Sequence, residues 1–105
     1  VGQTTSGAEE IAKRAPGARV VKAFNTTCYN NMLDPVYDGE STTLFIAGDD
    51  GAAKATVAEL AETLGFDVAD VGGLSTARFL EPLALAWISL AMSQGREIAF
   101  KLVRR

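Results

Sequence analysis

The sequence predicts an α/β protein whose C-terminal part is helical. Three observations predict this class: strand-like segments at residues 18–24, 42–47 and 66–71, helical periodicity between the second and third segments, and a long apolar helix after the third. A strand, a helix and a strand in this order favour a right-handed crossover and therefore a parallel pair. The 105 residues, 48% of them hydrophobic, suffice for a single domain.

The first predicted element is a helix that begins after Ser6. Ser6 is a typical N-cap residue, and Glu9, three positions later, completes a capping box. Pro16 and Gly17 end this helix. The mainly apolar character of residues 18–24 then indicates a strand that is covered on both faces.

A polar connection is expected between the first and second strands. Residues 30–41 contain the turn signals Asp34-Pro35 and Asp38-Gly39 and are predicted to form a loop. The β-forming residues 42–47 follow as the second strand.

A helix is expected over residues 51–64, after the second strand. Asp50 can cap its N-terminus, and Gly65 can end it in the left-handed conformation. Periodicity predicts a buried stripe on this helix, formed by Ala53, Val57, Leu60, Ala61 and Leu64.

A long helix over residues 76–93 is expected after the third strand, with Ser75 as its cap and with a kink at Pro82. Because its apolar side chains point nearly all round, one small sheet cannot cover it. A missing domain, a second subunit or a large flat ligand would have to cover the rest. A short final helix is expected over residues 97–103.

The composition excludes several classes of function. The chain has no histidine, which removes Ser-His and Cys-His nucleophilic pairs and the usual zinc ligand sets. Cys28 is the single cysteine, so a reducing, cytoplasmic location is expected. Ten basic and thirteen acidic residues, without a basic stripe, argue against a nucleic-acid partner. No apolar run is long enough to span a membrane.

A polar run follows the first predicted strand. Ligands of open α/β sheets bind beyond the carboxyl ends of the strands, where Asn25, Thr26 and Thr27 are expected. Their side chains can bind a ligand, or they can satisfy only the backbone of the turn. Both interpretations stay open at this point.

Two further motifs have a structural and a functional interpretation. Asp49 and Asp50 can cap the following helix, or they can hold metal ions for a phosphoryl-transfer enzyme; capping is the simpler explanation. The segment Gly72-Gly73-Leu74-Ser75 can form a tight turn, or its free N–H groups can bind an anion. No metal site is expected.

Three segments resemble a known family. The motifs "KAFNTT" at residues 22–27, "LFIAGDD" at 44–50 and "DVGGLSTARFLEPLALAWI" at 70–88 occur in the same order in NADPH-dependent oxidoreductases. The chain resembles the coenzyme F-420-dependent NADP oxidoreductases and, more distantly, the cytosolic domains of six-transmembrane ferric reductases. The resemblance covers nearly the whole chain. It corresponds to the second half of the sequence of a family member.

The resemblance implies a division of the chain and a set of site residues. Residues 1–74 would be the end of a Rossmann-like domain and residues 75–105 a helical C-terminal part. NADP(H) would be the cofactor, with a flavin or the deazaflavin coenzyme F-420 as hydride acceptor. The implied contacts are Ala23 and Asn25 near the nicotinamide, and Thr26, Thr27, Leu74 and Arg78 toward the acceptor.

The Gly-rich turn that holds a dinucleotide is absent from the sequence. We therefore expect a fragment of a longer oxidoreductase that is inactive by itself, with a missing N-terminal half or a second subunit covering the helix from Phe79 to Met92. A homodimer is the expected assembly. The alternative is a complete, non-catalytic interaction module that dimerises through the same helix.

Overall fold

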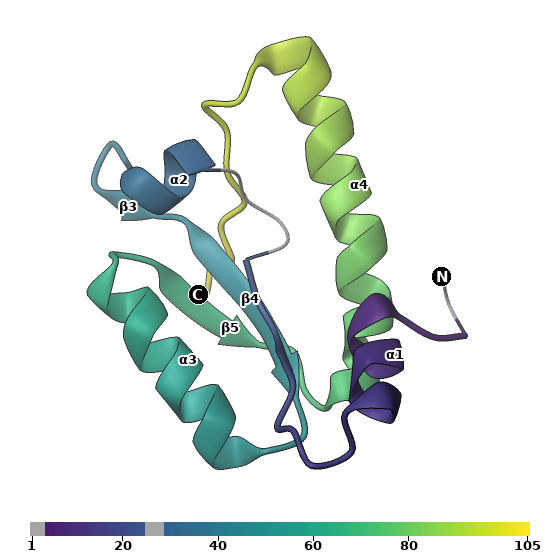
Figure 1. Ribbon diagram of the computed structural model, residues 1–105. Helices are drawn as coiled ribbons and strands as arrows, with labels where there is room; N and C mark the ends of the chain where they lie inside the picture. Colours follow the sequence, from purple (N-terminus) through teal and green to yellow (C-terminus); the bar gives the residue numbers. More distant parts are fainter. Residues whose placement is uncertain (1–3, 25–28) are drawn as a thin grey trace.

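The structure is a computed structural model that describes residues 4–24 and 29–105 (Figure 1). Its main sheet has the strand order β1–β4–β5, with β1 at Val21–Lys22, β4 at Thr43–Gly48 and β5 at Asp67–Asp70. β4 and β5 are parallel, as predicted, whereas β1 is antiparallel to β4. The α/β class is confirmed. The first strand is much shorter than the apolar run at residues 18–24.

Helices cover both faces of this sheet. α3, Gly51–Thr63, lies on one face, and α1, Gly7–Arg14, lies on the other face together with α4, Ala77–Gln94 (Figure 1). Successive side chains of a strand point to opposite faces, so β4 contributes to two separate apolar clusters. The α3-face cluster consists of Leu44, Ile46, Ala61 and Phe66, and the α4-face cluster of Ala8, Ala47, Leu74, Ala77 and Leu80.

Two of the predicted helix caps are confirmed. The Ser6 hydroxyl accepts the Glu9 N–H at 3.2 Å, and the Asp50 carboxylate accepts the Ala53 N–H at 2.8 Å. Ser75 does not cap α4, because Leu74–Thr76 form a 3-10 turn that leads into it. α4 then continues through Pro82 as a single helix.

The buried stripe of α3 differs from the predicted one. Ala61 is fully buried, and Val57 and Ala58 pack against the same cluster. Leu60 and Leu64 are 62% and 52% exposed, so their predicted burial is wrong. A three-stranded sheet is too narrow to cover the broad stripe that apolar periodicity alone suggests.

The predicted loop at residues 30–41 contains regular structure. It forms α2, Tyr29–Leu33, and a hairpin of β2, Val36–Tyr37, with β3, Glu40–Ser41. Asp38 and Gly39 have φ values of 49° and 82°, as a two-residue type I′ hairpin turn requires. The turn was therefore predicted correctly, but the helix and the strands were missed.

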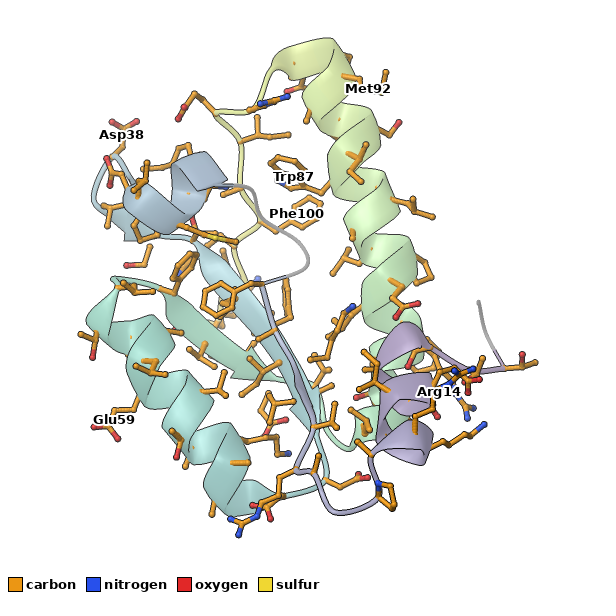
Figure 2. The ribbon with its side chains drawn as sticks, in the orientation of Figure 1. Arg14, Asp38, Glu59, Trp87, Met92 and Phe100 are labelled. Atoms are coloured by element: carbon orange, nitrogen blue, oxygen red, sulfur yellow. The ribbon has the colours of Figure 1, made fainter. Side chains whose placement is uncertain are left out.

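The C-terminal segment, residues 95–105, is not helical, so the predicted helix at 97–103 is wrong. The Asn31 side-chain amide and the Trp87 indole N–H both donate to the Ile98 carbonyl, at 2.9 and 3.2 Å. The Thr43 N–H donates to the Phe100 carbonyl at 2.9 Å. Figure 2 shows Trp87 and Phe100 pointing toward one another between α4 and this segment. Tertiary contacts thus hold the segment extended.

Candidate functional site

The two ends of the sheet present different residues, because β1 runs antiparallel to β4. Val21 pairs with Gly48, so the carboxyl ends of β4 and β5 lie beside the start of β1. The end of β1 therefore lies at the opposite end of the sheet from Leu74 and Arg78, which follow β5.

The acidic pair after β4, Asp49 and Asp50, accepts hydrogen bonds from backbone N–H groups. Asp50 caps α3, and the Asp49 carboxylate accepts the Leu74 N–H at 2.9 Å. A Cβ at Gly73 would lie 2.9 Å from the same Asp49 oxygen, so a larger residue there would displace the Asp49 side chain. Asp49 therefore occupies the Leu74 N–H, one of the groups that we considered for anion binding. The capping interpretation of Asp50 is confirmed.

A depression of about 310 Å³ adjoins this end of the sheet. Its lining includes Arg19, whose Nε lies 3.7 Å from an Asp50 oxygen, and Leu74. At the neighbouring end of β5, Lys54 binds Asp70 at 2.9 Å. Partial burial would raise the pKa of Asp70, but hydrogen bonds from Lys54 and the Gly72 N–H outweigh it and lower the pKa. The carboxylates of Asp50 and Asp70 are thus bound by groups of the protein itself.

Arg78 forms a two-pronged ion pair that joins α4 to α1. Its Nε and Nη2 donate to the two carboxylate oxygens of Glu9, at 2.8 and 2.9 Å. The bond to Arg78 lowers the pKa of Glu9 in spite of partial burial, and the same bond raises the pKa of Arg78. The Ser6 hydroxyl also binds Glu9, at 3.0 Å. The partner of Arg78 is thus 69 positions away, and the local pairing with Glu81 that spacing allows does not form.

Glu81 joins the same helices to β1. Its carboxylate accepts the Gly7 N–H at 2.8 Å, at the N-terminus of α1, where a negative charge is favoured. The Lys22 ammonium lies 3.6 Å from the same carboxylate oxygen. Lys22 and Glu81 are both about three-quarters buried, so this corner holds charged groups largely away from water.

The predicted cofactor residue Ala23 lies on the other face. Its side chain packs against the α3-face cluster. The Ile46 carbonyl accepts the N–H of Val71, just after β5, so the neighbouring Ala47 turns its backbone toward Lys22. Because alternate residues bond on opposite edges, the backbone N–H and C=O of Ala23 point to the edge of β1 away from β4.

Of the other predicted site residues, Asn25, Thr26 and Thr27 lie outside the described residues, as does Cys28. Leu74 is buried in the α4-face cluster, and Arg78 is half-buried. The structure brings Leu74 and Arg78 together at the start of α4.

Phe24, the last described residue before this segment, has an unusual backbone. Its φ is 59°, a left-handed conformation that is rare for a bulky residue. Its ring packs edge-on against Phe66, with centroids 5.7 Å apart and an interplanar angle of 83°. Strained residues of this kind concentrate at functional sites, so Phe24 marks the end of β1 as a candidate.

Sequence reasoning missed the roles of Lys22 and Glu9. The mainly apolar residues 18–24 contain two charged residues, Arg19 at the start and Lys22 in the interior. The interior position of Lys22 was a usable signal of a specific role. Glu9 was identified only as part of a capping box, and its long-range partner has no signature in spacing. Within residues 4–24 and 29–105, no three His, Cys, Asp or Glu side chains are grouped as metal ligands.

Similarity to known proteins is concentrated among reductases. The structure of a candidate F420-dependent NADP-reductase from Arthrobacter sp. FB24 matches with a TM-score of 0.89 and 41% identity, over 96% of this chain and 47% of that protein. Metalloreductase STEAP3 of Rattus norvegicus is 40% identical over 80 residues, which are 76% of this chain and 16% of the metalloreductase. The chain is homologous to part of these reductases.

A hypothetical protein from Sinorhizobium meliloti is also similar, with a TM-score of 0.60 and 39% identity over 67% of this chain and 35% of that protein. No protein-family model matches the chain. The matches to the two reductases confirm the resemblance found in the sequence. The chain spans about half the length of the Arthrobacter protein and a smaller share of the other two proteins. No helix in the described part of the chain is long and apolar enough to cross a membrane.

Proposed function

We propose that this chain forms the ring-binding part of an NADP(H)-dependent oxidoreductase. The enzyme transfers a hydride between NADPH and a flavin or a deazaflavin such as coenzyme F-420. The observation that supports this most directly is the similarity, across 96% of the chain, to a candidate F420-dependent NADP-reductase. The metalloreductase match over 80 residues points to the same class of chemistry.

The end of β1 suits the nicotinamide side of such a site. The backbone N–H and C=O of Ala23 face the edge of β1 that has no partner strand among the described residues, where they can bind a carboxamide in the plane of the sheet. We propose that Ala23 acts through these backbone groups, since its side chain is packed in the α3-face cluster. Asn25 would add a side-chain amide next to them.

The start of α4 suits the acceptor side. Arg78 uses two of its five N–H donors for Glu9, which leaves three for an acidic or carbonyl group of a flavin-like ring. Because Glu9 fixes the guanidinium, little side-chain entropy would be lost on binding. Leu74, which lines the adjoining depression, would contribute an apolar wall. The assignment of Thr26 and Thr27 to the acceptor side rests on the family resemblance.

The chemistry asks little of the protein beyond orientation. The bound nicotinamide and the acceptor ring supply the hydride transfer itself, and the protein aligns the two rings and excludes water. A chain without histidine is therefore suited to the reaction. The present chain lacks the Gly-rich turn that holds a pyrophosphate, so nucleotide binding would depend on other residues of the active enzyme.

The proposal is tested with the full-length protein and purified NADPH. NADPH oxidation is followed with a flavin and with coenzyme F-420 as acceptors. Asn25→Ala should lower kcat/KM about 10-fold or more, because a lost ligand hydrogen bond costs roughly 1.4 kcal/mol or more. Thr56→Ala, on the exposed side of α3, is the control and should leave the kinetics unchanged. Equal kinetics of both variants would exclude Asn25 from the site, and no turnover with any flavin or deazaflavin would reject the function.

A non-catalytic interaction module remains the second candidate. The observation that favours it is the large apolar surface that α4 leaves exposed. An absence of nicotinamide-nucleotide binding by the full-length protein, measured by calorimetry, would favour this module over the oxidoreductase.

A further inference from the structure

Lys22 is a cation that lies on the α4 face and makes few contacts with its partners. Its neighbours Val21 and Ala23 pack against the α3-face cluster, so the alternation of a strand directs the Lys22 side chain to the other face. There its ammonium lies 3.6 Å from an oxygen of Glu81, which is longer than a hydrogen bond. Among the described residues, the ammonium has no other partner. A side chain that is only 25% exposed therefore has N–H donors that these residues do not satisfy.

Arg78, the other cation of this corner, is bonded more completely. It donates to both carboxylate oxygens of Glu9, so a carboxylate in direct contact offsets its charge. Glu81, in contrast, also accepts the Gly7 N–H at 2.8 Å, so its charge is shared between Lys22 and the N-terminus of α1. Lys22 thus offers more of its positive charge to a ligand than Arg78 does.

Lys22 also lies between the two sides of the proposed ring-binding site. The next residue along the chain, Ala23, presents its backbone to the edge of β1 that we assign to the nicotinamide. On α4, Arg78 of the acceptor side is one helical turn before Glu81, the partner of Lys22. An acceptor ring beside the Lys22 side chain would therefore be adjacent to a nicotinamide bound at Ala23. The inference that follows rests on the proposed function.

We propose that Lys22 stabilises the reduced acceptor ring electrostatically. In the proposed reaction, a hydride leaves C4 of the dihydronicotinamide with both electrons of its C–H bond and forms a bond to N5 of a flavin or C5 of a deazaflavin. NADPH becomes NADP+, and the acceptor ring takes up the electron pair as negative charge at N1 and the C2 carbonyl. An ammonium already in place at this edge lowers the energy of the transition state as the charge develops. The acceptor class is a ring whose reduced form is an anion.

The test uses the full-length protein, NADPH, and riboflavin or coenzyme F-420 as acceptor. Lys22→Met keeps the length of the side chain and removes its charge. Hydride transfer in a single turnover should be at least about 10-fold slower in this variant, because an interaction that strengthens in the transition state is lost. The Kd of NADPH should not change. Lys22→Arg, which keeps the positive charge, should recover most of the rate.

A spectroscopic readout distinguishes this role from a merely structural one. The absorbance of the bound reduced acceptor reports the protonation of N1 directly, so the titration of the neighbouring carboxylates of Glu9 and Glu81 does not obscure it. A nearby cation favours the anion, so the N1 pKa in the wild type should lie at least about one pH unit below its value in Lys22→Met. The Arg78 charge is present in both proteins and does not contribute to the difference.

Two further variants control for indirect effects. Lys13→Met removes an exposed lysine of α1 and should leave the rate and the N1 pKa unchanged. Lys22→Met leaves the partly buried Glu81 without a cation, which can disturb folding. Lys22→Met combined with Glu81→Gln removes both charges, and it should change the rate and the N1 pKa in the same direction as Lys22→Met alone.

The outcomes separate this inference from the proposed function. An active protein in which Lys22→Met changes neither the rate nor the N1 pKa would overturn the inference and leave the function intact. A slower rate with an unchanged N1 pKa would indicate a structural role for Lys22 and would also overturn it. A wild-type protein that transfers no hydride to any flavin or deazaflavin would reject the proposed function and this inference together.

Discussion

The two helical faces of the sheet are stabilised by different interactions. On the α3 face, Leu44, Ile46 and Phe66 form an apolar cluster that the ring of Phe24 joins. On the α4 face, the apolar cluster is bordered by two ion pairs, Arg78 with Glu9 and Lys22 with Glu81.

This difference indicates where a polar ligand can bind. On the α3 face, the pair of Lys54 and Asp70 lies beyond the cluster, at the end of β5. On the α4 face, charged groups are partly buried beside β1, where they are oriented and incompletely solvated. We therefore propose the α4 face as the side of the sheet on which a charged or hydrogen-bonding ring system finds partners.

The largest expected effect is on the α3 face. Phe66→Ala removes a side chain that is 4% exposed, together with the aromatic contact to Phe24. We expect a loss of about 3–5 kcal/mol in the free energy of unfolding, measured by urea denaturation, because the cavity adds to the lost transfer energy. The loss should be the same at pH 5 and pH 7. A loss below about 1 kcal/mol would mean that this cluster does not stabilise the fold.

On the α4 face, Arg78→Gln should lower the midpoint of urea denaturation by a measurable amount. The decrease should be smaller than that caused by Phe66→Ala. The substitution leaves the largely buried Glu9 carboxylate without its two hydrogen bonds from Arg78. Lys13→Gln is the control, since Lys13 pairs with Glu10 at the exposed surface of α1 and such pairs contribute little. Equal midpoints for the two variants would show that the Arg78 pair is no more stabilising than a surface pair.

The α4 face should also make stability depend on pH. Since the Arg78 bond lowers the pKa of Glu9 in the folded state, the unfolded state takes up the proton first. The stabilisation is complete at neutral pH and is lost as the pH falls below the ordinary glutamate pKa of about 4.3. Glu9→Gln should flatten this acid dependence between about pH 5 and pH 3. It should not abolish it, because the pKa values of Glu10 and Asp70 are also lowered. An unchanged slope would contradict the assignment.

The smallest expected effect is at Leu60. Because this side chain is mostly exposed, Leu60→Gln should change the free energy of unfolding by no more than about 0.5 kcal/mol. Ala61→Gln, one position later, should cost about 1–3 kcal/mol or more, because it forces a long polar side chain into a filled cluster. Urea denaturation of both variants distinguishes the observed buried stripe of α3 from the one predicted by periodicity.

Local signals in the sequence predicted local structure well. The caps at Ser6 and Asp50, the turn at Asp38-Gly39 and the parallel β4–β5 pair all depend on residues close together in the chain. The family resemblance was likewise carried by three short motifs.

Long-range contacts account for the errors. The C-terminal segment has helical periodicity, but Asn31 and Trp87 bind the carbonyl of Ile98 and hold it extended. The direction of β1 depends on its pairing with β4, which no local pattern specifies. For the site, the Glu9 partner of Arg78 lies in a different helix, and no spacing in the sequence indicates it. Tertiary context decided each of these cases.

The fully buried Asn31 has a practical consequence for anyone who shortens the protein. Its amide donates to Ile98, and its oxygen accepts the hydroxyl of Tyr37, so one side chain ties α2, the β2–β3 hairpin and the C-terminal segment together. A truncation before Ile98 would leave the Asn31 amide and the Trp87 indole as unsatisfied donors in the interior.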